Sequence, residues 1–262
     1  MGLDLGDATS IGDECYLPPQ MMPGEMGINL MGIVEDATPL RPLPFTRYEC
    51  ETLARTYGIP TQQRLQGSRA TVAAYKQLLG SVGRLHSSHH ASANFSQSLN
   101  CALALADGDL TLAQLLSPDW RFPELEEVFA SYCEGNLGSL EIADDWLTLA
   151  TGFLCAGARS VISTQWSVED LASALFALFY YKNRFGQYTR PEAIQRAQRQ
   201  LRQLTGQELG IYRQEVEAFL QQQFAADSEA YKLAQVRFMA CCNEAMPVAH
   251  PYYWAGFVGQ GL

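Results

Sequence analysis

Two short stretches decide the fold of this chain: LHSSHH at residues 85–90 and FASYCEG at residues 129–135. Each begins as a short buried strand and ends in a reactive side chain, an imidazole at His90 and a thiol at Cys133. Two such strands placed side by side in a parallel sheet bring their carboxyl ends to the same edge, where the functional sites of open α/β sheets gather. The pattern therefore predicts a histidine base beside a cysteine nucleophile.

Strand-like and helix-like segments alternate along the rest of the chain, which favours a mostly parallel sheet with helices on both faces, a three-layer α/β/α sandwich. Residues 1–27 lack periodicity and are expected to form an irregular lead-in to one domain over residues 28–262. An apolar helix is expected over 168–185 and a single helix over 208–224. The aromatic run at 252–258 is expected to close the sheet as a strand.

Composition narrows the class of protein. The 262 residues are 47% hydrophobic, carry a formal net charge of -10 and include seven scattered cysteines. The acidic balance disfavours nucleic acid as a partner, because a phosphate backbone would be repelled. An odd number of cysteines at irregular spacing does not form a disulfide framework and indicates a reducing compartment, so we expect a cytoplasmic protein. We see no secretory signal and no apolar run near the ~20 residues of a membrane span, and therefore expect no membrane partner.

Three histidines within five residues raise the question of a metal site. In a strand, His86 and His90 point to one face and His89 to the other. No paired cysteines stand at zinc spacing, so no metal and no cofactor are expected. A histidine packed in the core is the favoured interpretation of His86.

Five motifs in the same order together resemble the CHAT domain, a family of caspase-like peptidases often joined to TPR repeats. Each motif alone is weak, but the resemblance runs from about residue 27 to the end. The matching segments are residues 85–90, 131–134, 156–161, 166–170 and 250–257.

The resemblance implies a caspase-like sandwich and a cysteine endopeptidase that cleaves a protein or peptide substrate. Cys133 falls on the family's nucleophile and His90 on its general base and acid. The backbone N–H groups of Ala91 and Cys133 would hold the oxyanion that forms during the reaction. A TPR or other regulatory protein is the expected partner.

Acidic and aromatic side chains near the thiol are candidates for substrate binding. Glu134, Asp144 or Asp145 could form the floor of a pocket that selects Arg or Lys, and Trp166 could form a wall of the groove. Helix capping by the two aspartates and a core position for the tryptophan are the alternatives.

Two other functions stay open at this point. Ala91 stands where the family usually has glycine, which favours a catalytically silent scaffold that binds protein partners. The intact pair of His90 and Cys133 argues against that alternative, because a scaffold needs neither residue. A third and weaker hypothesis is another thiol-dependent hydrolase or transferase.

Overall fold

The computed structural model describes residues 31–35, 43–92, 94, 97–131 and 148–262. Its main sheet has six strands in the order β2-β1-β3-β7-β8-β9. The first five run parallel and β9 runs antiparallel to β8. The strands are β1 Met31–Glu35, β2 Arg64–Leu65, β3 Arg84–Ser88, β7 Glu127–Ser131, β8 Ser160–Thr164 and β9 Phe257–Gly261. The expected parallel sheet is confirmed.

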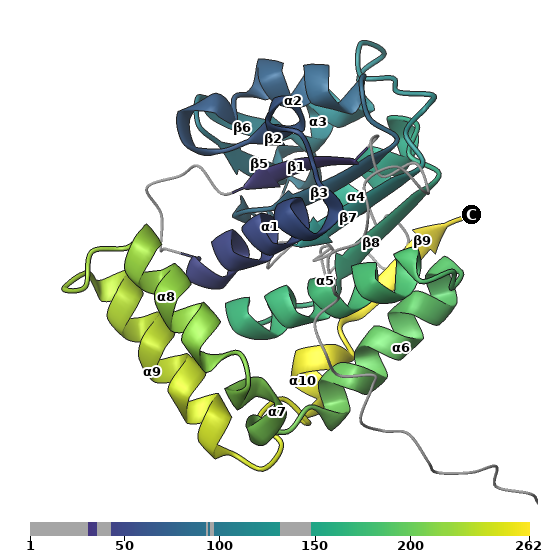
Figure 1. Ribbon diagram of the computed structural model, residues 1–262. Helices are drawn as coiled ribbons and strands as arrows, with labels where there is room; N and C mark the ends of the chain where they lie inside the picture. Colours follow the sequence, from purple (N-terminus) through teal and green to yellow (C-terminus); the bar gives the residue numbers. More distant parts are fainter. Residues whose placement is uncertain (1–30, 36–42, 93, 95–96, 132–147) are drawn as a thin grey trace, which may run out of the picture.

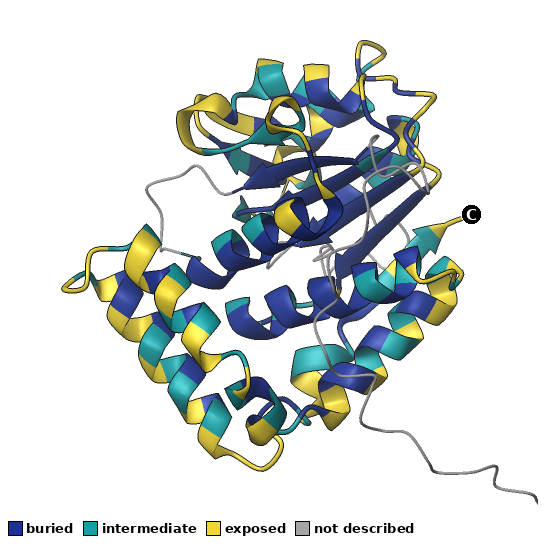
Figure 2. Ribbon diagram, viewed as in Figure 1, coloured by how far each residue is buried: buried dark blue, intermediate teal, exposed yellow. Residues whose placement is uncertain are grey.

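Helices cover both faces of this sheet, and Figure 1 shows α1 and α5 lying against one of them. One face packs on α1 Pro44–Tyr57 and α5 Asp170–Phe185, through strand residues such as Ile33, Phe129 and Ile162. The other face packs on α2 Val72–Leu79, α3 Leu112–Leu116 and α4 Leu149–Cys155. Figure 2 shows the strands buried between these layers. The fold is therefore the expected α/β/α sandwich. Strands that are covered on both faces need a continuous run of apolar residues rather than an alternating one.

A small antiparallel sheet lies beside the end of β3. Its strands are β4 Ala91–Ser92, β5 Ala102–Leu105 and β6 Gly108–Thr111, in that order. The turn between β5 and β6 contains Asp107, and Gly108 takes a φ of 141° that few other residues tolerate. This sheet continues directly from β3 through the two residues His89 and His90.

The C-terminal half adds a layer of helices outside α5. They are α6 Arg190–Gln203, α7 Gly206–Gly210, α8 Arg213–Gln223, α9 Glu229–Asn243 and α10 Pro251–Trp254. No described helix combines the length and the apolar character that crossing a membrane requires.

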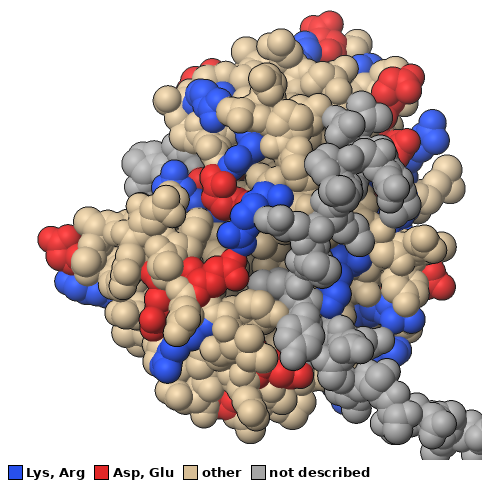
Figure 3. Space-filling model, in the orientation of Figure 1, with Lys and Arg blue, Asp and Glu red and all other residues tan. Residues whose placement is uncertain are grey.

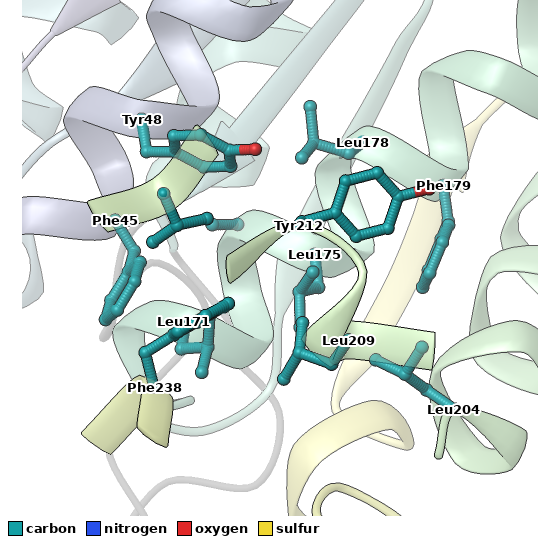
Figure 4. A pocket seen from close by; sticks show the side chains of 12 residues that line it. Phe45, Tyr48, Leu171, Leu175, Leu178, Phe179, Leu204, Leu209, Tyr212 and Phe238 are labelled. Carbon is teal, nitrogen blue, oxygen red and sulfur yellow. The ribbon is translucent and has the colours of Figure 1, made fainter. Parts of the chain in front are cut away.

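A cavity remains where α7, α8 and α9 pack on α1 and α5, with leucine, phenylalanine and tyrosine side chains around it (Figure 4). Its free volume of about 20 Å³ is close to that of one water molecule. Apart from the hydroxyls of Tyr48 and Tyr212, the side chains around it are apolar, so we interpret this small space as a packing gap in the core.

Two sequence expectations for this half were wrong. The single helix expected over 208–224 is two helices, because Thr205 and Glu208 form a capping box that starts α7 earlier and Gly210 ends it. The strand expected over 252–258 begins only at Phe257. Residues 251–254 form one turn of helix, since His250 caps it and Pro251 sits at its first position.

Candidate functional site

The ends of β3 and β7 lie next to each other in the sheet. The two strands pair in parallel, with Ser88 in register with Ser131 at their last residues. His90 follows β3 by two residues. The expected juxtaposition of the two strand ends is thus confirmed. Cys133, Glu134, Asp144 and Asp145 lie outside the described residues.

His90 is held from two sides through its carbonyl oxygen. This oxygen accepts hydrogen bonds from the backbone N–H of Ala104 (3.0 Å) and from Nδ1 of His89 (3.1 Å). A carbonyl can only accept, so Nδ1 of His89 carries the hydrogen and its Nε2 accepts from Ser87 Oγ (2.8 Å). The chain continues to the hydroxyl of Tyr75, 2.9 Å from Ser87 Oγ. These contacts fix the backbone from which the His90 imidazole projects.

A second polar network lies on the opposite face of β3. His86 Nε2 is 2.6 Å from Glu49 Oε1, and neither side chain has any exposed surface. Burial raises the pKa of Glu49, while His86 and the hydroxyls of Ser131 and Ser88 act in the opposite direction. The two serines are the last residues of β7 and β3, so the Glu49 carboxylate stands directly beneath both strand ends.

His86 is a core residue, as the sequence interpretation favoured. Its ring packs between Phe129 (centroids 5.3 Å apart) and Tyr181 (5.5 Å). Its 0% exposure keeps it out of reach of any substrate. Among the described residues, no group of three His, Cys, Asp or Glu side chains is arranged to hold a metal ion.

Asp170 fixes the position of helix α1 relative to α5. Its carboxylate accepts hydrogen bonds from the backbone N–H groups of Phe45 (2.8 Å) and Thr46 (3.0 Å) and from Thr46 Oγ1 (3.1 Å). It therefore satisfies donors at the start of α1 that have no partner within the helix. Burial raises the pKa of Asp170 to about 7, against the effect of these hydrogen bonds.

A groove of about 500 Å³ opens beside His90. Its walls come from the start of α1, the start of α5, α9 and α10. They include His90, the ion pair of Glu169 with Arg237, and the side chains of Leu233 and Tyr252. The pair is bidentate, with Nε–Oε1 at 2.6 Å and Nη2–Oε2 at 2.8 Å. This volume lies within the usual range of ligand sites in proteins.

The two remaining predicted site residues occupy different places. Ala91 begins β4 and pairs with Leu103, so its backbone follows His90 at the edge of the small sheet. Trp166 is not among the residues that line the groove. Its Nε1 donates to the carbonyl of Tyr252 (2.8 Å), and its ring lies where a Cβ on Gly256 would be only 2.8 Å away. Trp166 therefore supports the turn of α10 that presents Tyr252.

Sequence reasoning missed Glu49 and Asp170 as parts of the site. Asp170 is the last residue of the matching segment 166–170, and in the structure it is the first residue of α5. The signal for Glu49 was available, because a carboxylate among the buried positions of α1 needs a buried partner.

The fold and the two strand ends define a caspase-like α/β sandwich with a histidine at the site edge. On the face that Figure 3 displays, basic and acidic side chains lie next to one another. The family model of the CHAT domain matches residues 29–261, and the chain belongs to this caspase-like family. No curated protein matches the chain.

Proposed function

We propose that this chain is a cysteine endopeptidase that cleaves a protein substrate with Cys133 and His90 as its dyad. The observation that carries the proposal is the register of β3 with β7, which aligns Ser88 with Ser131 two residues before each member of the dyad. Membership of a caspase-like family supports it. The reducing cytoplasm, which keeps thiols free, is the proposed compartment.

In the proposed reaction, His90 takes the proton of the Cys133 thiol and stabilises the thiolate as an ion pair. The thiolate attacks the carbonyl carbon of the scissile peptide, and the oxyanion binds the backbone N–H groups of Ala91 and Cys133. The imidazolium then protonates the leaving amine, and water hydrolyses the thioester under base catalysis by His90. No cofactor takes part.

The choice of substrate is also a proposal. Glu134, Asp144 or Asp145 would provide the negative charge for an Arg or Lys side chain at the scissile residue. A TPR-containing or other regulatory protein would control access, since an unrestrained endopeptidase damages its own cell.

The test uses peptide acyloxymethyl ketones with Arg, Lys, Asp or Leu at the scissile position, read by mass spectrometry. We expect labelling at Cys133 that falls about 10²- to 10⁴-fold in rate in His90→Ala, the usual contribution of a general base. Cys155, an exposed cysteine outside the site, is the internal control and should stay unlabelled. Equal labelling of both thiols would contradict the proposal.

A catalytically silent protein-binding scaffold is the second candidate. The specific observation in its favour is Ala91, where the family usually has glycine. An Ala91→Gly variant separates the two. If only this variant reacts with the probes, the natural chain is a scaffold.

A further inference from the structure

The groove beside His90 has walls that are mostly apolar. Its described lining includes Leu43, Pro44, Phe45, Val168, Ala230 and Ala234. Two more lining residues, Leu233 and Tyr252, are large hydrophobic side chains that are 49% and 44% exposed. Because large exposed hydrophobic side chains that gather in one concave place mark a binding surface, this groove has the character of a subsite.

The carboxylates in the described lining already have partners. Glu169 is bound on both oxygens by Arg237, and Asp170 accepts three hydrogen bonds from the start of α1. Removing the Arg237 side chain would leave the Glu169 carboxylate facing the groove without its partner. In the protein as it stands, this part of the site offers no uncompensated negative charge to a Lys or Arg side chain of a substrate.

His90 itself lines the groove, so an occupant of the groove also reaches the proposed catalytic imidazole. A volume of about 500 Å³ accommodates a few side chains and not a folded domain. An extended peptide segment with apolar side chains fits these walls. Two of the lining residues, Val168 and Phe45, are buried, at 3% and 2% exposure.

We infer that this groove is a specificity subsite for apolar residues of the substrate next to the scissile residue, with Leu233 and Tyr252 as its determinants. The inference rests on the proposed peptidase function. It adds a second requirement to a cleavage sequence, distinct from the proposed basic scissile residue. A substrate then carries an apolar side chain beside its Arg or Lys.

Binding to a Cys133→Ala variant tests the subsite without catalysis. Fluorescent peptides with the same scissile Arg but with either Leu and Phe or Gly and Ser at the adjoining positions are compared by anisotropy. Leu233→Ser and Tyr252→Ser should each weaken binding of the apolar peptide about tenfold, the cost of one unburied apolar side chain. Binding of the Gly and Ser peptide should stay within about twofold.

Val236→Ser is the matched control. Val236 lies on the same helix, is 69% exposed and does not line the groove, so its loss should leave binding unchanged. Arg237→Leu releases Glu169, and this variant should gain affinity for peptides with Lys at the apolar positions. Equal binding of both peptides to the parent, or an equal loss in Val236→Ser and Leu233→Ser, would overturn the inference. Failure of the peptidase function would show separately, as absent labelling of Cys133 in the unsubstituted chain.

Discussion

Removing the carboxylate of Glu49 tests the buried network beneath the two strand ends. In Glu49→Ala, His86 keeps its place between Phe129 and Tyr181 but loses the partner 2.6 Å away. Both side chains are fully buried, so neither water nor salt replaces the lost contact. Breaking a buried pair in this way typically costs about 3–5 kcal/mol, a large part of the 5–15 kcal/mol that stabilises an ordinary domain.

The double variant Glu49→Leu/His86→Phe gives the sharper comparison. It removes both members of the buried pair, and Ser88 and Ser131 keep their hydrogen bonds to Thr46 and Ser173. A phenyl ring meets the same aromatic neighbours as the imidazole. We therefore expect the double variant to be more stable than Glu49→Ala, and close to the parent chain. Urea unfolding followed by circular dichroism measures all three free energies.

Two results would refute this reasoning. A loss below about 1 kcal/mol in Glu49→Ala would mean that the pair contributes little. A double variant as unstable as Glu49→Ala would mean that the unpaired buried histidine is not the cause of the loss.

Three further predictions concern other described contacts. Burial raises the pKa of Glu35 to about 7, so the folded chain holds its proton where the unfolded chain has lost it. Stability should therefore fall with rising pH between about 4.5 and 7, by up to about 1.4 kcal/mol per unit, and Glu35→Gln should flatten this slope in unfolding titrations. Gly157→Ala should lower the free energy of unfolding by more than about 2 kcal/mol, because the φ of Gly157 is 118° and the new Cβ would lie 2.6 Å from the carbonyl oxygen of Phe122. Gly67→Ala should lower it less, because Gly67 has a φ of 53° and open space around it. The melting temperatures of the two variants test this difference. Arg55→Ala should change the free energy of unfolding by less than about 1 kcal/mol, because the ion pair of Arg55 with Glu215 is exposed to solvent. A larger loss would show that this surface ion pair stabilises the fold more than exposed pairs usually do.

Local sequence patterns predicted the sheet and the position of His90 well. Short runs rich in β-branched residues, such as 160–164, indicate buried strands, and parallel order follows from the helices between them. The same reasoning failed at 251–254, where a capping histidine and a proline outweighed the strand propensity of the aromatic residues that follow. Local signals at a helix start can therefore override propensity over a single turn.

Long-range partners were beyond the reach of such patterns. Asp170 binds the backbone of Phe45, 125 residues away in the sequence. Glu49 meets His86 on another element altogether. Periodicity identifies which face of a helix is buried, but it does not identify the atom that a buried carboxylate will meet. The groove formed by α9 and α10 was missed for the same reason.

The adjacent residues Glu169 and Asp170 have a mechanical consequence. The first is bound to Arg237 of α9 and the second to the start of α1, so one peptide unit carries both attachments. Both walls of the groove are therefore attached to one short stretch of backbone at the start of α5, so a substitution that shifts this backbone is expected to change the width of the groove at both walls together.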